Sequence, residues 1–279
     1  MTEQPHSKRK ISGKGCAFSL HHYKDMLLHA QKLGYRFITL SETGAKELAM
    51  REANANAKII VLRHDIDIAP VHALEFAKIE HMLGIRASYF ILLHEPTYNP
   101  FDTKHFDILR QIMQLGHEIG LHYEARFFEQ RGIDPYLGIA QDMHILTKAL
   151  RCITPEYSVR SISQHNPASA KVYGQLQKIA VDAYHPDLIN GIYKYLSDSG
   201  RSWREGCLCQ HLGKQDKLHV LIHPVWWMHP DWDFAKILQN NAKRTSADIK
   251  KYIQEVIRQT YAYLERREKL DAQRARYYR

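Results

Sequence analysis

One short stretch in the first quarter of the chain constrains the fold more than any other. The aliphatic run Ile59–Leu62 is followed by Arg63 and His64, and then by two carboxylates, Asp65 and Asp67. A continuous aliphatic run of this length is typical of a strand buried in a parallel sheet. Side chains alternate along a strand, so Asp65 and Asp67 are predicted to share one face. Two interpretations are open: a metal or acid/base site, or one Asp capping the next helix while the other pairs with Arg63.

The same order of strand and helix recurs along the chain. Strands are predicted at 37–40, 59–66, 87–93, 118–124, 157–163, 181–184, 193–196 and 218–222, and helices at 20–33, 42–51, 71–83, 103–115, 136–151 and 168–179. Strands and helices that alternate at intervals of about 30 residues favour parallel βα units. We therefore expect an α/β fold built on a parallel sheet.

Ionisable residues follow several of these strands directly. They are Asp65 and Asp67, His122 and Glu124, His165, Asp198, and His223. In a barrel of parallel strands the carboxyl ends converge on one face, where active sites of such folds lie. The sequence therefore predicts a functional site at this face.

Composition favours one globular domain with terminal extensions among the 279 residues. We predict a flexible lead over 1–16, a barrel over 17–235 and a basic helix over 236–279. Neither an 18-residue apolar run nor an apolar signal segment occurs, which makes the cytoplasm the expected compartment. The four cysteines are few and scattered, and Cys207-Leu208-Cys209 lacks the two-residue spacer of common zinc loops. We expect them to be reduced, packed thiols.

The C-terminal segment is basic and amphipathic. Residues 243–279 hold eleven Lys/Arg against five Asp/Glu, within a net charge of +9. The charge predicts a solvated face or a peripheral contact with acidic lipid head groups, and we expect no nucleic-acid partner. An apolar stripe on the same helix predicts docking against the barrel or against another subunit of a homo-oligomer. The stripe consists of Ile249, Tyr252, Ile253, Val256, Ile257, Tyr261 and Leu264.

Five motifs in order across residues 58–228 carry a resemblance to a known family. They are Arg63-His64-Asp65-Ile66-Asp67, the segment 116–124 (GHEIGLHYE), 163–167 (SQHNP), 195–199 (YLSDS) and 221–227 (LIHPVWW). Together they resemble the polysaccharide deacetylase superfamily, which comprises carbohydrate esterase family 4 and its relatives. The Arg-His-Asp-Ile-Asp form of the first motif indicates a divergent bacterial branch.

The resemblance implies a distorted, incomplete (β/α) barrel of about seven parallel strands with a C-terminal helical extension. It implies that Asp65 is the general base, that Asp67 and His122 bind a divalent metal ion such as zinc, and that His223 is the acid. The implied activity is that of a hydrolase acting on carbon–nitrogen bonds other than peptide bonds. It would remove an N-acetyl group from an N-acetylated sugar or glycan intermediate by metal-activated water.

The sequence departs from the family at the second motif. Four residues after His122 the family carries a second metal-binding His, whereas this chain has Arg126, which cannot coordinate a metal. The third ligand is therefore predicted to be His165, or Glu124 in its place. Two alternatives follow from this departure: a metal-independent amide C–N hydrolase on the same fold, or a catalytically degenerate glycan-binding or scaffold protein.

Four residues near the predicted site are candidates for contact with a substrate. Trp226 and Trp227 have indole faces of the kind that stack on sugar rings, although packing in the core is an equal alternative. Arg63 is a candidate for binding an anionic substituent. Asp198 is predicted either to hold a turn or to contact the substrate or the base.

Overall fold

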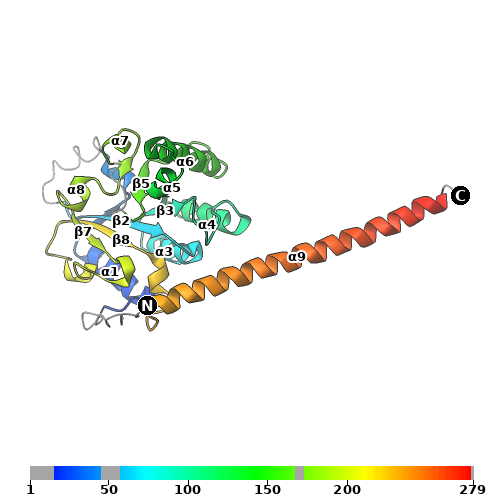
Figure 1. Cartoon of the computed structure of the whole chain (residues 1–279). Helices are drawn as coiled ribbons and strands as arrows, with labels where there is room; N and C mark the ends of the chain where they lie inside the picture. Colours follow the sequence, from blue (N-terminus) through cyan, green and yellow to red (C-terminus); the bar gives the residue numbers. More distant parts are fainter. Residues whose placement is uncertain (1–15, 45–56, 167–172, 278–279) are drawn as a thin grey trace, which may run out of the picture. The chain divides into compact units, whose positions relative to one another are not determined.

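The computed structural model describes residues 16–44, 57–166 and 173–277 (Figure 1). The predicted lead over 1–16 lies outside these ranges except for Cys16, as does most of the predicted helix over 42–51. Both of these predictions therefore stay untested.

The described strands form one parallel sheet. They are β1 (Arg36–Ile38), β2 (Ile59–Ile66), β3 (Ser88–Leu92), β4 (Glu118–Tyr123), β5 (Ser161–Gln164), β6 (Val181–Asp182), β7 (Lys194–Ser197) and β8 (Lys217–Ile222). Seven of them follow the order β6-β5-β4-β3-β2-β8-β7, and β1 pairs with β2 beside this path. Strands β6 and β7 lie at the two ends of this path and are not neighbours in it. The curved sheet of the described residues is therefore an incomplete barrel. The predicted fold class is confirmed.

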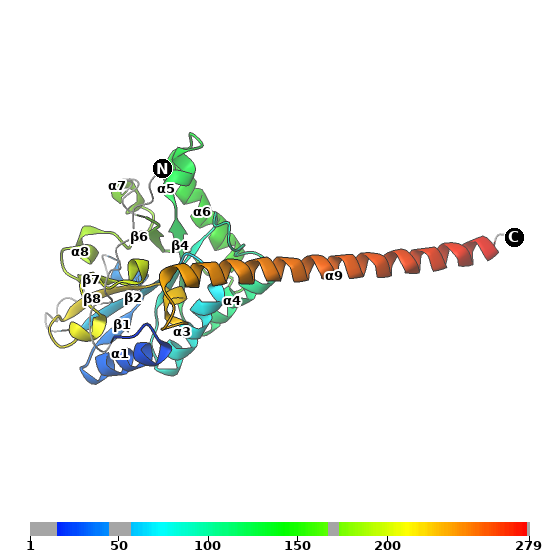
Figure 2. The same cartoon turned by 60° about the horizontal axis from the view of Figure 1, so that its bottom comes forward.

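Helices connect the strands and cover the outside of the sheet. They are α1 (Leu20–Lys32), α3 (Pro70–Met82), α4 (Thr103–Gln114), α5 (Ala125–Glu129), α6 (Pro135–Leu150), α7 (Tyr173–Leu176) and α8 (Pro186–Ile189). A further helix, α9 (Phe234–Tyr277), follows the last strand. Helix α3 packs on β2, and α4 and α6 pack on β4, along the same side of the sheet in Figures 1 and 2. The sequence did not predict α5 and α8, because elements of five and four residues are too short to show helical periodicity.

The central strand β2 is buried along its whole length and presents a different chemistry on each face. On the inner face, Ile59 and Val61 belong to a core cluster that includes Phe90, Leu188 and Tyr193. Farther along this face come Arg63 and Asp65. On the outer face, His64 meets Glu80 of α3, with 2.6 Å between Nε2 and Oε1. The predicted alternation of the strand therefore separates the candidate site from a second polar cluster.

Gly120 of β4 gives the inner face of the barrel room for a large neighbour. It pairs with Phe90 of β3, and a Cβ at position 120 would overlap the ring of Phe90 and crowd the hydroxyl of Ser161. Glycine is therefore a packing requirement at this position rather than a turn signal.

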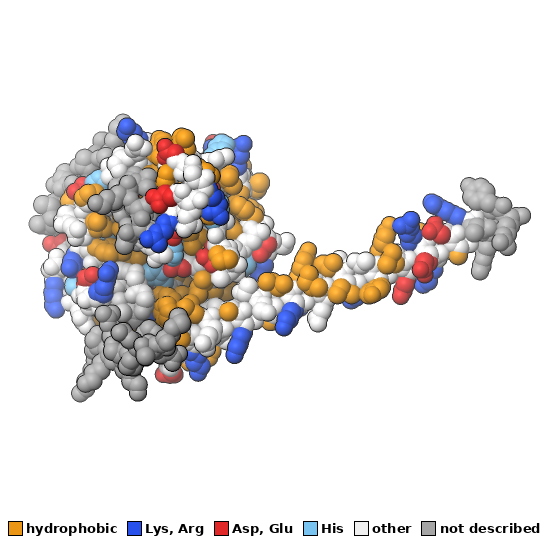
Figure 3. Space-filling view, in the orientation of Figure 1, with side chains coloured by type: hydrophobic (Ala, Val, Ile, Leu, Met, Phe, Trp, Pro, Cys, Tyr) orange, Lys and Arg blue, Asp and Glu red, His pale blue; other side chains and the backbone are white. Residues whose placement is uncertain are grey.

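The chain divides into two compact units, with the boundary between Phe234 and Ala235. The second unit consists of helix α9 almost entirely, and exposed apolar side chains run along it (Figure 3). All seven residues of the predicted stripe are exposed, from Val256 at 39% to Tyr252 at 68%. None of the helices in the described ranges combines the length and the apolar character that crossing a membrane requires.

Candidate functional site

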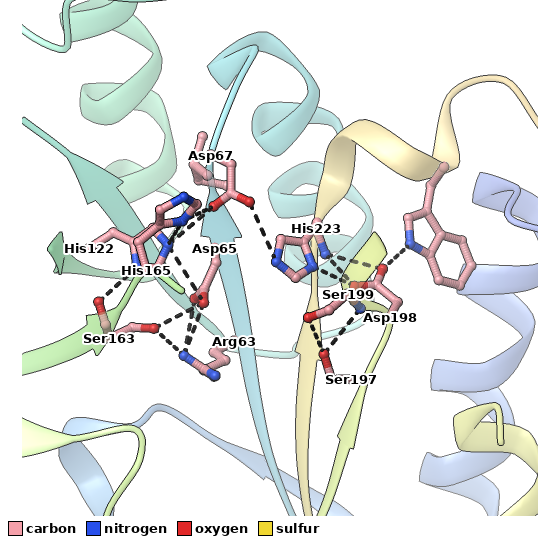
Figure 4. A network of polar contacts seen from close by, with 12 residues as sticks. Arg63, Asp65, Asp67, His122, Ser163, His165, Ser197, Asp198, Ser199 and His223 are labelled. Atoms are coloured by element: carbon pink, nitrogen blue, oxygen red, sulfur yellow. Dashed lines mark hydrogen bonds and ion pairs between the residues drawn. The ribbon is translucent and has the colours of Figure 1, made fainter. Parts of the chain in front are cut away.

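Strands that are far apart in the sequence bring their carboxyl ends together in one polar cluster (Figure 4). The contributions are Asp65 from β2, Asp67 just after it, His122 from β4, His165 after β5, Asp198 after β7, and His223 after β8. This is the convergence expected at the carboxyl face of a parallel barrel.

Three of these side chains form a group with the composition of a metal site. The ligand atoms of Asp67, His122 and His165 all lie within 4.8 Å of one another. Asp67 Oδ1 is 3.1 Å from His122 Nε2 and 3.4 Å from His165 Nδ1. The two imidazole nitrogens are 3.2 Å apart. One carboxylate and two imidazoles form a ligand set that catalytic zinc sites use.

The surroundings of His122 suit a metal ligand. Its Nδ1 lies 2.7 Å from the carbonyl oxygen of Ser163, and only an N–H can be shared with a carbonyl. The other nitrogen, Nε2, faces Asp67 and is the atom that would bind a metal. Metal-binding histidines are commonly oriented through such a contact. The side chains of Asp67 and His165 are 24% and 26% exposed, so an ion can reach the group from solvent.

The charges of this group depend on one another. Burial raises the pKa of Asp67, but the nearby His223 and the hydrogen bonds from His122 and His165 outweigh it and hold the pKa well below its usual range. Burial lowers the pKa of His165, but its hydrogen bond to Asp67 outweighs this effect and the net pKa is raised. Asp67 is therefore a carboxylate at neutral pH and attracts positive charge to this point.

Asp65 lies deeper than Asp67 and is fixed by two partners. Arg63 Nη1 is 3.2 Å from Oδ1 and 3.1 Å from Oδ2, and Ser163 donates its hydroxyl to Oδ2 at 2.9 Å. The guanidinium of Arg63 also contacts Ser163 and lies 4.8 Å from the ring centroid of Tyr184. Asp65 Oδ2 is 3.9 Å from His122 Nε2, so this carboxylate borders the metal-type group without belonging to it.

His223 approaches the group from the opposite side. Its Nδ1 donates to Asp198 Oδ1 at 2.6 Å, and its Nε2 lies 3.7 Å from Asp67 Oδ2. Burial lowers the pKa of His223, but Asp67 and Asp198 outweigh it and raise the pKa to about 9. Trp227 donates its indole N–H to Asp198 Oδ2 at 2.8 Å. His223 is thus a protonated imidazole with a fixed ring orientation.

The helix-cap interpretation of the two aspartates is half right. The N-cap of α3 is Ala69, with φ of 53°, and no side chain caps this helix. Asp67 therefore does not serve as the cap. Asp65 does pair with Arg63, as that interpretation had it, and the same pairing fixes the orientation of the carboxylate that is the predicted base.

The structure distinguishes the two candidates for the third ligand. Glu124 caps α5 and accepts a hydrogen bond from the backbone N–H of Arg126 at 3.2 Å. His165 lies against Asp67 and His122 instead. The geometry therefore favours His165, and Arg126 is exposed on α5.

The substrate contacts predicted for three residues need correction. Arg63 is 0% exposed, Trp227 is 1% exposed and Trp226 is 5% exposed, so a sugar ring has almost no surface of theirs to touch. Arg63 and Trp227 support Asp65 and Asp198 from behind, and Trp226 packs on Phe234 at 5.0 Å between ring centroids. Asp198 is fully buried and contacts His223, the predicted acid.

Ser163 is the member of the site that the sequence did not indicate. In the sequence it is the last residue of the predicted strand 157–163 and the first of the segment 163–167, yet its hydroxyl contacts Asp65 and its carbonyl orients His122. A small polar residue on a buried strand was the available signal, because such a side chain needs a partner inside the sheet.

Comparisons with known proteins find a likeness among solved structures. No protein-family model matches the sequence, and no curated protein matches it. Among solved structures, the chain is similar to one described as the structure of a family 4 carbohydrate esterase from Bacillus anthracis. The two chains are 15% identical with a TM-score of 0.40, and the alignment covers 85% of this chain and 89% of that one. At this identity and score the likeness bears on neither the activity nor the site.

Proposed function

We propose that this protein is a metal-dependent hydrolase that removes the acetyl group from an N-acetylated sugar or glycan intermediate. The observation that carries the proposal is the meeting of Asp67, His122 and His165 beside a fixed Asp65 and a protonated His223. Such a set supplies metal ligands, a base and an acid within one cluster. The sugar class rests on the resemblance of the five motifs.

The proposed metal would be held by Asp67, His122 and His165. A zinc ion bound there supplies Lewis-acid chemistry, because it polarises an amide carbonyl and lowers the pKa of a water molecule. The three protein ligands would leave coordination positions for substrate and water, as catalytic zinc sites require.

Asp65 would act as the general base. It would take a proton from the water that attacks the acetyl carbonyl carbon. Arg63 and Ser163 contact this carboxylate and hold it in one orientation, so the base does not need to reorganise during the reaction.

His223 would act as the general acid. As the C–N bond breaks, the amine takes the proton of His223 Nε2 and acetate remains. Asp198 holds Nδ1 and fixes which nitrogen faces the reaction. The proton lost by His223 is balanced by the proton that Asp65 gains, so both residues return to their starting states by proton exchange with solvent.

The first experiment measures bound metal and acetate release in the same samples. The purified protein is expected to bind one zinc or cobalt ion at this site and to release acetate from at least one member of a panel of N-acetylated nucleotide sugars and lipid-linked sugars. Asp67→Ala and His122→Ala should lose this metal. Asp65→Asn and His223→Gln should keep the metal and lose roughly 10²–10⁴-fold in rate.

His144→Ala is the matched control, because His144 is exposed on α6 and distant in sequence from every residue of the cluster. It should leave metal content and rate unchanged. Acetate release that persists in Asp67→Ala without metal would instead support a metal-independent amide hydrolase. A filled site that releases no acetate from any compound of the panel would support a binding or scaffold role.

A further inference from the structure

A second cluster of possible metal ligands lies outside the site described above. It consists of Cys16, just before α1, His22 in the first turn of α1, Cys207 at the N-cap of the short 3-10 helix Leu208–Gln210, and Cys209 within that helix. Cys16 and Cys209 are 193 positions apart in the sequence, yet their sulfur atoms are 3.4 Å apart. Nothing in the proposed mechanism uses any of these four side chains.

The spacing of the four ligand atoms fits a tetrahedral zinc ion. Zn–S and Zn–N distances of about 2.3 Å and 2.0–2.1 Å place three sulfurs and one nitrogen of a tetrahedron about 3.5–3.8 Å apart. His22 Nε2 is 3.4 Å from Cys207 Sγ, and all four ligand atoms lie within 4.8 Å of one another. The atoms therefore surround a volume of the right size for one ion.

We propose that Cys16, His22, Cys207 and Cys209 bind a structural zinc ion. Three thiolates and one imidazole form a closed ligand set, which is typical of zinc sites that hold a fold together. Soft sulfur ligands favour zinc over magnesium or calcium. Cys207 is buried, and the other three residues are half-buried, so the ion is shielded and offers no open position for a substrate.

The sequence-based expectation of packed, unliganded thiols overlooked this arrangement. The spacing Cys-x-Cys is shorter than in common zinc loops, and the other two ligands lie near the opposite end of the chain. A structural zinc contributes to stability because it joins segments that are otherwise independent. Here it would join the start of α1 to the turn that precedes β8.

The cluster also contacts the support of His223. The rings of Phe18 and Trp227 are 5.0 Å apart between centroids, and the imidazole of His22 stacks on Trp227 at 6.4 Å. Trp227 in turn donates to Asp198, which holds His223. An effect of the zinc on catalysis rests on the proposed function, whereas the binding of zinc does not.

The experiment uses the full chain with Asp67→Ala and His122→Ala, which removes the other candidate metal site. Under reducing conditions this double variant is expected to retain one zinc ion per chain. X-ray absorption should show three sulfur neighbours and one nitrogen neighbour of zinc, with Zn–S distances of about 2.3 Å. Substitution with cobalt should give a sulfur-to-cobalt charge-transfer band in the near ultraviolet.

Cys16→Ser and Cys209→Ser, added singly to the double variant, should abolish the charge-transfer band or weaken it strongly. Cys152→Ser is the control, because Cys152 is an exposed free thiol outside the cluster and its loss should leave zinc and spectrum unchanged. The X-ray absorption measurement needs no cysteine variant. It therefore tests whether sulfur atoms bind the zinc even where a cysteine variant fails to fold. A double variant that holds no zinc, or a Cys16–Cys209 disulfide that forms under these conditions, would overturn the proposal. The absence of acetate release would leave it intact.

Discussion

The charge of His223 depends on two carboxylates that belong to different parts of the site. Asp67 is one of the proposed metal ligands and faces Nε2 of His223. Asp198 contacts Nδ1 on the other side of the imidazole ring. A metal ion on Asp67 would offset the first of these negative charges. Asp198 would then be the remaining carboxylate that keeps the imidazole protonated at neutral pH.

This arrangement predicts how activity depends on pH. A proton donor whose pKa is raised by a buried carboxylate is charged at neutral pH and loses its proton as the pH rises through that pKa, so activity should fall on the alkaline side. Asp198→Asn removes a charge that raises the pKa of His223. The alkaline limb of the profile of kcat/KM should therefore move to lower pH.

The control for this profile is Asp107→Asn, because Asp107 is an exposed residue of α4 paired with Arg110. It should leave the profile in place, and bound metal should be equal in all three proteins. An alkaline limb that Asp198→Asn does not move would exclude His223 as the donor.

At the scale of the elements, α3 is attached to the sheet through one buried carboxylate. Glu80 contacts His64 of β2 at 2.6 Å, and it accepts hydrogen bonds from Tyr89 of β3 at 2.6 Å and from Tyr23 of α1. Burial raises the pKa of Glu80, but His64 outweighs it and the net pKa is lowered. The carboxylate is therefore charged and joins three elements on the outer face of β2.

Glu80→Gln should lower the free energy of unfolding by about 3 kcal/mol, because it removes a buried carboxylate that His64, Tyr89 and Tyr23 all contact. Urea unfolding of the metal-loaded protein measures this change. Glu75→Gln, on the exposed side of the same helix, should change the free energy by no more than about 0.5 kcal/mol. Equal effects of the two substitutions would contradict a special role for Glu80.

The same scale shows which elements the sequence could predict. Long apolar strands and helices with regular spacing, such as β2 and α4, agree with their predicted ranges within about two residues. The strand predicted at 157–163 begins only at Ser161 in the structure. The hydroxyl of Tyr157 contacts the backbone of Ile119, and the backbone N–H of Val159 donates to Thr147, so this segment uses side-chain partners instead of a ladder. Hydrophobic periodicity alone cannot show that side-chain hydrogen bonds replace strand pairing in this segment.

At the scale of the whole molecule, the sequence predicted the site better than the cysteine cluster. The residues of the site each follow a strand, and the geometry of parallel sheets brings such positions together whatever the loops between them do. Cys16 and Cys209 follow no such rule, because their meeting depends on how α1 and the turn before β8 pack against each other. Tertiary packing of this kind leaves little trace in local sequence.

The division of the chain at Phe234 leads to a prediction about independence. A shortened chain ending at Lys243 should keep the unfolding temperature of the barrel within about 2 °C and should keep the proposed metal, since the first compact unit ends at Phe234 and most apolar side chains beyond Lys243 are exposed. Differential scanning calorimetry and metal analysis test this expectation. If the unfolding temperature instead falls by much more than about 2 °C, α9 contributes to the stability of the barrel.

The pairing of the sheet also has a consequence for the synthesis of the chain. Strand β2 lies between β3, which follows it closely in the sequence, and β8, which pairs with it from Ile59 with Lys217 to His64 with Ile222. On the ribosome, one edge of β2 therefore stays unpaired until almost four-fifths of the chain has been translated. Such an edge invites pairing with other nascent chains. Strand β2 is synthesised early, and its second edge is paired only after translation has passed residue 222.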